Sequence, residues 1–321
     1  MPRPSPRARR ALLQLTPVIV IAALVGIVAS DSGGSRDKRA RKRDELSGTV
    51  SIDGAAALRG LVDRAAERFE TRHPEVRVTV GASGDENAIA IFCTGEVDIA
   101  AVARRLDRTE RRSCRSADTR YVPIEVAREG IALVVSEQND FVRCLRLSQV
   151  RAIWRRTDPL DTWGDVNPRF PPAPLDPVGS KPDGTPYTLM AEALFGPADP
   201  LTRNDYTVAD DPVDLRDTVA ASPDRVGFLP VTQIGSKAGV RPVAVDAGHG
   251  CVTPTPDSVR DGSYRVLSRP LYLTVNTDAA KSPAVRRFIA EYLKRPPRIR
   301  RSDGMVSVRR LHRLYRKFTR P

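Results

Sequence analysis

Residues 49–102 decide the fold, and they read TVSIDGAAALRGLVDRAAERFETRHPEVRVTVGASGDENAIAIFCTGEVDIAAV. Apolar residues recur every three or four positions early in this stretch, which places them on one face of a helix: Leu58, Leu61, Val62, Ala65, Ala66 and Phe69. Val76, Val78 and Val80 then alternate with polar residues, as in a half-buried strand. The predicted elements are, in order, a strand at 49–52, a helix at 58–69, a strand at 76–80, a helix at 88–94 and a strand at 98–102. This order favours an α/β fold whose largely parallel sheet carries helices on its faces.

The rest of the chain continues the alternation of short strands and helices, without an internal repeat. Apolar runs predict strands at 131–135, 226–230 and 271–275, and helical spacing predicts helices at 147–154, 187–195 and 284–293. The proline-rich segment 168–177 predicts a loop. Residues 306–321 form a basic tail in which we expect a helix at 306–318. Its apolar side chains would face the body: Val308, Leu311, Leu314, Tyr315 and Phe318.

Charge is distributed unevenly along the 321 residues, whose formal net charge is +13. The excess of basic residues lies at the two ends, at 3–43 and 294–320. No zinc-finger spacing, basic zipper or aromatic-basic RNA-binding motif accompanies these ends. We therefore interpret them as solvated or membrane-facing flanks, and we expect no nucleic-acid partner.

The N-terminal segment indicates the compartment. A basic flank at 1–10, expected in the cytoplasm, precedes an uncharged run at 11–30 that is long enough to cross a bilayer as a helix of about 20 residues. The run is either an uncleaved anchor or a signal peptide cleaved after the small residues at 28–30; a buried core helix is the third reading. The charged, glycine-containing segment 31–45 predicts a linker. The folded part is then extracytoplasmic, either membrane-anchored or secreted.

The sequence offers no support for catalysis or for a bound cofactor. Its four cysteines form no Cys-x-x-Cys pair and its three histidines have no partner spacing, so we expect no metal site. No phosphate-binding P-loop or dinucleotide-binding glycine motif is present. An even number of cysteines in an exported chain favours two disulfides, with four buried free thiols as the alternative.

Three loops at the ends of predicted strands are candidates for ligand binding. They are 53–57, 81–84 and 103–105, and each leads toward a helix start. Ligands of open α/β sheets bind at the carboxyl ends of strands, and helix N-termini favour anions. Small residues at helix starts are also found in ordinary compact turns, so the loops alone do not decide between these readings.

The order of segments from about 46 to 306 resembles the phosphate-binding proteins of ABC transporters. The first matching pieces are SIDG at 51–54, FCTGEVDI at 92–99, EGIALVV at 129–135, CL at 144–145 and IW at 153–154. The later ones are TWGDV at 162–166, NDYT at 204–207, GCV at 250–252 and LSRPL at 267–271. Their order and spacing together carry the resemblance.

This resemblance implies a two-lobed type II periplasmic-binding-protein fold with mixed sheets, following the N-terminal membrane or signal helix. The first lobe would be discontinuous, at 46–128 and 240–305, and the second lobe would be 129–239. The resemblance also implies two disulfides, Cys93–Cys114 and Cys144–Cys251. A small phosphate-like oxyanion would bind between the lobes for an ABC permease, and we expect a monomer.

The ligand loops depart from the family pattern. The family's hydroxyls after the first strand are replaced by three alanines, its Ser-Arg-Pro becomes Ala-Arg-Arg at 103–105, and its Asp-Ser-Gly-Thr becomes Asp-Gly-Thr. The expected ligand set is Ala55, Ala56, Ala57, Ser83, Gly84, Arg104, Asp183, Gly184 and Thr185. Two hypotheses follow: an uptake protein whose lobes close over an oxyanion, or a membrane-anchored, ligand-silent scaffold or sensor that keeps the fold. An unrecognised hydrolase is a third, weaker one.

Overall fold

The computed structural model describes residues 46–182, 184–196, 202–235, 239–308 and 311. The predicted β-α-β-α-β stretch is present as β1 (Gly48–Gly54), α2 (Ala56–Arg72), β2 (Val76–Val80), α3 (Asp85–Cys93) and β3 (Ile99–Val102). Strand β1 pairs in parallel with β2 on one side and with β3 on the other. A Cβ added to Gly54 would lie 1.8 Å from the Ala101 carbonyl oxygen, so this close approach of β1 and β3 requires glycine.

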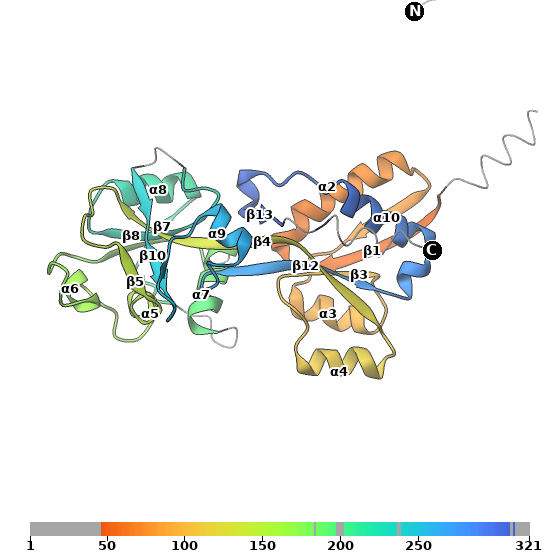
Figure 1. The fold of residues 1–321 in the computed structure, drawn as a ribbon, viewed down its shortest axis with the longest axis horizontal. Helices are drawn as coiled ribbons and strands as arrows, with labels where there is room; N and C mark the ends of the chain where they lie inside the picture. Colours follow the sequence, from red (N-terminus) through yellow and green to blue (C-terminus); the bar gives the residue numbers. More distant parts are fainter. Residues whose placement is uncertain (1–45, 183, 197–201, 236–238, 309–310, 312–321) are drawn as a thin grey trace, which may run out of the picture. The chain divides into compact units, whose positions relative to one another are not determined.

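Helices cover both faces of this parallel sheet (Figure 1). Ile99 and Ala101 of β3 pack in a cluster with α2 and with α10 (Pro283–Lys294). The alternate residues, Ala100 and Val102, pack in a separate cluster with α3 and with α4 (Arg108–Ser116). Because successive side chains of a strand point to opposite faces, a short apolar strand is buried on both sides here.

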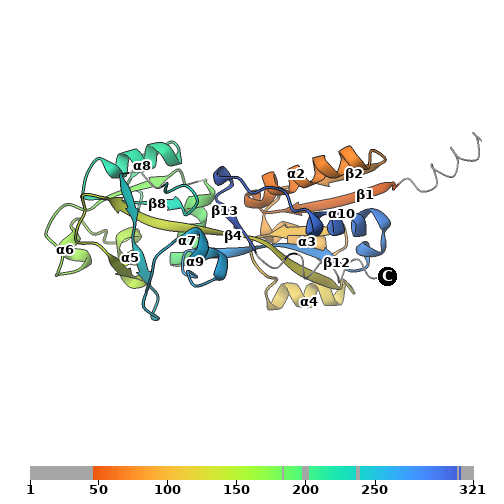
Figure 2. The same cartoon turned by 45° about the horizontal axis from the view of Figure 1, so that its top comes forward.

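The two clusters on the faces of the β1–β3 sheet together form the first core. Two long strands connect this core to the second core. Strand β4 (Tyr121–Ser136) pairs with β12 (Ser268–Asn276) through residues 121–130, and then with β8 (Arg225–Pro230) through residues 131–135. Strands β6 (Asp176–Ser180) and β7 (Thr207–Ala209) complete the order β2-β1-β3-β12-β4-β8-β6-β7. In Figures 1 and 2, β4, β12 and β13 (Met305–Ser307) lie between the elements of the two cores.

The second core is built around its largest buried side chains, Trp154, Trp163 and Tyr264. A three-stranded sheet with the order β11-β10-β5 lies beside the main sheet. The remaining elements of this half are β5 (Cys144–Arg146), α5 (Leu147–Trp154), α6 (Trp163–Val166), α7 (Thr185–Phe195), α8 (Pro212–Ala220), β9 (Val240–Pro242), β10 (Ala244–Asp246), β11 (Cys251–Val252) and α9 (Pro256–Asp261). Two short 3-10 helices, Ala279–Lys281 and Arg301–Asp303, lie near the C-terminal end.

Residues 240–267 were expected in the first lobe, but they pack in the second core. Strand β9 pairs with the end of β4, and β10 pairs with β5. Val243, Tyr264 and Leu267 are buried in the same cluster as Trp154. The apolar side chains of 240–267 are buried in the second core. The chain therefore returns to the first core only at β12.

Both disulfides implied by the resemblance are present. Cys93 of α3 is bonded to Cys114 of α4, with their Cα atoms 4.2 Å apart. Cys144 of β5 is bonded to Cys251 of β11, with Cα atoms 6.0 Å apart. Each disulfide therefore joins two elements within one core.

The predicted tail helix is corrected at its start. Residues 306 and 307 belong to β13, which pairs with residues 127–129 of β4 instead of beginning a helix. Val308 and Leu311 contact the first core as expected, and residues 312–321 lie outside the described part. The segments 1–10, 11–30 and 31–45, predicted as a basic flank, an anchor or signal peptide and a linker, also lie outside the described part. Among the described residues, no helix has the length and apolar character needed to cross a membrane.

Candidate functional site

A pocket of about 510 Å³ opens between the two cores. The first core contributes the start of α2, and the second contributes the end of β6 and the starts of α7 and α8. Strand β4, which belongs to both cores, contributes Glu129 and Ile131. The polar and small residues of the lining include Ala56, Ala57, Gly60, Ser180, Lys181, Gly184, Thr185, Asp210, Asp211, Gln233 and Ser302.

Helix α2 begins at this pocket without a side-chain cap. Its N-cap residue, Ala55, has no side-chain oxygen that could accept a hydrogen bond from the first turn. The backbone N–H of Ala55 itself donates to the Ala101 carbonyl at 2.8 Å. The first N–H groups of a helix have no intrahelical acceptor, so those of Ala56 and Ala57 depend on a partner from the pocket or on water.

Helix α7 begins on the other side of the same pocket and also lacks a side-chain cap. Its N-cap is Gly184, and Pro186 in the first turn has no N–H to satisfy. Ser180 ends strand β6 nearby, and its buried hydroxyl oxygen has no hydrogen-bond partner among the described residues. Helix α8 differs, because Asp211 accepts hydrogen bonds from Val213 and Asp214 and closes that helix start to an added anion.

The charged side chains that line the pocket have ionic partners, except Asp211, which caps α8. Lys181 lies 3.0 Å from Asp210. Arg269 of β12 donates from Nε to Glu129 and from Nη1 to Glu192 of α7, the latter at 2.8 Å. Burial raises the pKa of the Glu129 carboxyl in spite of this partner. Burial would lower the pKa of Arg269, but the surrounding carboxylates outweigh it and raise that pKa.

The other expected ligand residues are not in the lining of this pocket. Ser83 donates to Asp53 from its backbone N–H at 2.9 Å and from its hydroxyl at 2.7 Å. The Asp85 carboxylate, in the first turn of α3, accepts the Ala103 N–H at 3.0 Å. Burial raises the pKa of Asp85. The start of α3 thus carries its own carboxylate, which disfavours a second anion there.

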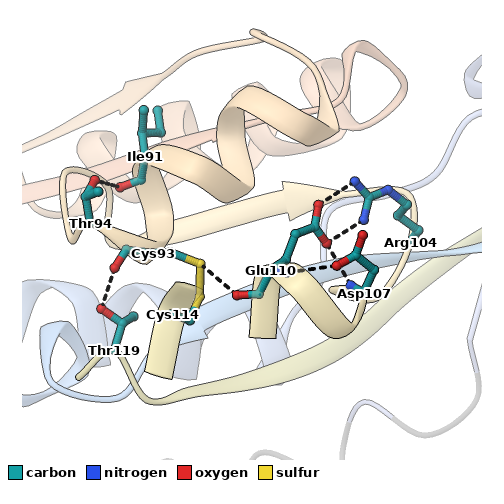
Figure 3. The surroundings of a disulfide bond; sticks show 8 residues. All are labelled: Ile91, Cys93, Thr94, Arg104, Asp107, Glu110, Cys114 and Thr119. Atoms are coloured by element: carbon teal, nitrogen blue, oxygen red, sulfur yellow. Dashed lines mark hydrogen bonds and ion pairs between the residues drawn. A yellow bond between two sulfur atoms is a disulfide. The ribbon is translucent and has the colours of Figure 1, made fainter. Parts of the chain in front are cut away.

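Arg104 is also engaged within the protein. Its guanidinium donates two hydrogen bonds to Glu110 of α4, both at 2.7 Å (Figure 3). Glu110 also accepts the Asp107 N–H at 2.7 Å in the capping box that begins α4. The pKa of Arg104 is raised, mainly by its hydrogen bonds to Glu110. The disulfide Cys93–Cys114 joins α4 to α3, so the Arg104 guanidinium is bonded to a helix that is itself covalently held.

The structure therefore brings together only part of the predicted set. Ala56, Ala57, Gly184 and Thr185 line one pocket, whereas Ala55, Ser83, Gly84 and Arg104 are not part of its lining. Asp183 lies outside the described residues. Sequence reasoning missed Ser180 and Lys181, because the proline-rich stretch before them was read as a loop and the strand that ends at Ser180 was not predicted.

The chain matches known proteins over most of its length. Residues 40–189 match a family described as a PBP superfamily domain. The chain is 30% identical to protein SphX of Synechococcus elongatus over 263 residues, which cover 81% of this chain and 77% of that protein. It is 24% identical to the phosphate-binding protein PstS of Staphylococcus aureus, covering 84% and 79% of the two chains.

Solved structures share the fold of this chain. A structure described as a possible phosphate binding protein from Planctomyces limnophilus has a TM-score of 0.74 and 25% identity, covering 86% of this chain and all of that one. PstS from Borrelia burgdorferi, at a TM-score of 0.64 and 14% identity over 82% of this chain and all of that one, shows the fold alone. The chain belongs to the PBP superfamily and, within it, to the PstS-like substrate-binding proteins.

Proposed function

We propose that the protein binds phosphate or another small oxyanion outside the cytoplasm and delivers it to an ABC uptake system. The observation that carries this proposal is the pair of helix starts, α2 from one core and α7 from the other, that reach one pocket without a side-chain cap. A helix N-terminus presents N–H groups and a partial positive charge, which together favour an anion. The names of the relatives support phosphate as the first candidate.

In this proposal the oxyanion accepts hydrogen bonds from the backbone N–H groups of Ala56, Ala57 and Thr185, whereas the Gly184 N–H already donates to the Lys181 carbonyl at 3.0 Å. The Ser180 hydroxyl, which has no hydrogen-bond partner among the described residues, donates a further hydrogen bond to the oxyanion. Closure of the lobes would occur around β4 and β12, the two strands that connect the cores, and would shorten the distance between the two helix starts. Ser83, Gly84, Asp183 and Arg104 remain part of the predicted set, and Arg104 would have to leave Glu110 to contribute.

The missing hydroxyls at 55–57 predict a weaker site than the family pattern. A hydrogen bond to a charged group contributes about 1.5–3 kcal/mol, so each lost donor weakens binding by roughly 10- to 150-fold. The ligand-silent alternative is not favoured, because the two uncapped helix starts and the Ser180 hydroxyl still converge on one pocket. Binding, not catalysis, is the role that we assign to the pocket.

The finer points of location and assembly belong to the same proposal. We propose that residues 11–30 hold the protein at the membrane, that an ABC permease receives the ligand, and that the protein acts as a monomer. The uncharged run at 11–30 supports the first point. The names of the relatives support the second.

Titration of the detergent-solubilised full chain with phosphate and with sulfate by calorimetry tests the proposal. Ser180→Ala is the informative variant, because it removes a hydroxyl that bonds to nothing in the described protein. We expect its folding stability to be unchanged and its oxyanion affinity to fall about tenfold or more. Thr71→Ala on exposed α2 surface is the control. Absence of binding by the unmodified protein would contradict the proposal.

A further inference from the structure

A basic hollow, separate from the oxyanion pocket, lies on the first core. It is formed by α2 and by residues 297–301, in the segment that joins α10 to β13 (Figure 1). Its charged lining consists of five arginines and one carboxylate: Arg64, Arg68, Arg298, Arg300, Arg301 and Glu67. Among the described residues, none lines both this hollow and the oxyanion pocket. The basic hollow is therefore a second place where charge can attract a partner.

Contacts at both ends hold the two walls of the basic hollow together. The Nη2 atom of Arg64 lies 2.6 Å from the Asp303 carboxylate. Arg68, one turn further along α2, donates from Nη2 to the carbonyl oxygen of Arg295. Residues 295–303 are thus held beside α2, and the protein itself fixes the backbone that carries the arginines.

The alternation of residues in the second wall turns its charges outward. Pro297 is buried and Ile299 is half-buried against the first core, whereas Arg298 and Arg300 are exposed. Successive side chains of an extended segment point to opposite sides, so packing of the apolar residues directs these arginines toward solvent. Arg301, at the start of the following 3-10 helix, is exposed as well.

The positive charge of the basic hollow is not neutralised within the described part of the protein. Asp303 compensates Arg64, but the other four arginines of the lining form no ion pair with a described carboxylate. Burial lowers the pKa of the Arg68 guanidinium, and the neighbouring Arg72 lowers it further. Four such arginines against the single Glu67 leave an excess of three positive charges.

The partner of the basic hollow is an anion from outside this chain. The two ends beyond the described residues, 1–45 and 312–321, both carry an excess of basic residues, so neither end supplies the missing negative charge. Every cation in the lining is an arginine, whose planar guanidinium binds phosphate oxygens through two parallel N–H groups. Phosphodiester groups therefore suit the basic hollow.

The point at which the chain enters the first core favours a membrane as the source of these phosphates. Leu46 packs against the first core, and the Gly48 N–H donates to the Glu75 carbonyl at 3.3 Å, just beyond the end of α2. The chain thus enters beside the helix that forms one wall of the basic hollow. A linker at 31–45 spans at most about 50 Å, so an anchor at 11–30 keeps this helix close to the bilayer.

We infer that the basic hollow docks the first core on a membrane surface rich in anionic phospholipids. The contact goes beyond the oxyanion site and adds to the proposed membrane attachment, because it assigns the side of the protein that faces the lipid. Each basic residue near an anionic surface contributes about fivefold to binding, so an excess of three charges favours the contact by roughly 100-fold. High salt screens these charges and weakens the contact.

Arginine labelling of the full chain in vesicles tests this contact. The chain is reconstituted from detergent into phosphatidylcholine alone or into an equal mixture with phosphatidylglycerol, and mass spectrometry follows its reaction with an arginine-specific dicarbonyl reagent. Arg108 is the internal reference, because it is exposed on α4, which packs on the other face of the first sheet. We expect Arg298 and Arg300 to react at least about tenfold more slowly in the mixed vesicles, and high salt should abolish the difference.

Two variants with the same change of net charge make the test specific. Arg298→Gln with Arg301→Gln removes two charges from the basic hollow, whereas Arg112→Gln with Arg115→Gln removes two charges from α4. All four side chains belong to exposed residues, so folding should not suffer. The first variant should reduce the protection of Arg300 to about twofold or less, and the second should keep the wild-type protection.

The outcomes separate this inference from the proposed function. Equal labelling in the two kinds of vesicle, or equal protection in the two variants, overturns the inference. Protection by inorganic phosphate in phosphatidylcholine vesicles, with none by phosphatidylglycerol, assigns the basic hollow to a free anion and also overturns it. If alkaline washing removes the chain from phosphatidylcholine vesicles while the mixed vesicles still protect the arginines, the anchor at 11–30 is contradicted and the inference stands.

Discussion

Replacement of Arg269 by methionine removes the cation beside the buried Glu129 carboxylate. The Glu129 side chain is 6% exposed and that of Arg269 is 22% exposed, so water compensates neither charge well. Breaking a buried ion pair by removing one partner typically costs about 3–5 kcal/mol. The carboxyl can escape by taking up a proton, which at pH 7 costs about 3.7 kcal/mol for an ordinary pKa of about 4.3. We therefore expect Arg269→Met to lose about 3–4 kcal/mol of folding free energy at pH 7.

The same reasoning fixes the sign of the pH dependence. The pKa of Glu129 is raised in the folded protein, and loss of Arg269 raises it further. A raised pKa means that the folded state holds the proton more tightly, so stability is greatest below the unfolded pKa and falls as pH rises toward the folded pKa. At pH 5 the cost of protonation is only about 1 kcal/mol, and the variant should recover most of its stability.

Urea unfolding at pH 5 and pH 7 measures these differences. Arg260→Met is the matched control, because Arg260 has a similar exposure of 25% but its partner Asp257 is 77% exposed. Exposed ion pairs contribute about 0–1 kcal/mol, so the control should lose little at either pH. Glu129→Gln together with Arg269→Met should recover stability at pH 7. A loss for Arg269→Met equal to that of the control, or independent of pH, would refute the reasoning.

Three further predictions concern the disulfides, the attachment to the membrane and the ligand site. Cys144→Ala with Cys251→Ala opens a loop of 107 residues and should lower the free energy of unfolding by roughly 3–5 kcal/mol, as measured with urea. Cys93→Ala with Cys114→Ala opens a loop of 21 residues and should cost less. The protein should stay in the membrane fraction through salt and alkaline washing and leave it in detergent; a soluble product that begins near residue 31 would contradict this. Ala56→Ser with Ala57→Thr should tighten phosphate binding about tenfold or more by calorimetry, because hydroxyls join the uncapped start of α2; an unchanged affinity would show that these side chains do not reach the ligand.

Sequence periodicity predicted the elements that carry an apolar face or run. Helix α2 was predictable from its apolar stripe, and β3 from its short apolar run. Helix α4 was missed because Cys114 is its only buried residue, so it has no apolar stripe. Its capping box, Asp107 with Glu110, was the available signal.

The site was less predictable, because its geometry depends on contacts between distant segments. The alanines at 56 and 57 and the Gly-Thr pair at 184–185 were found from the family pattern. The pairing of Arg104 with Glu110 and the carboxylate of Asp85 at the Ala103 N–H could not be seen in the sequence. Ser180 was missed because strand β6 starts within a stretch rich in proline.

The discontinuity of the first core has a consequence for biosynthesis. Strand β3 lies between β1 and β12, and the first core also needs α10, yet both β12 and α10 follow the whole second half in the chain. As the polypeptide emerges, β1, α2 and β2 appear first, but β3 keeps an open edge until residues 268–276 arrive. Most of the second half lies in the segment between and can pack earlier; only Val306 of β13 joins its cluster later. An unpaired strand edge is a template for aggregation, so this order of synthesis leaves the first half open to intermolecular pairing for longer than the second.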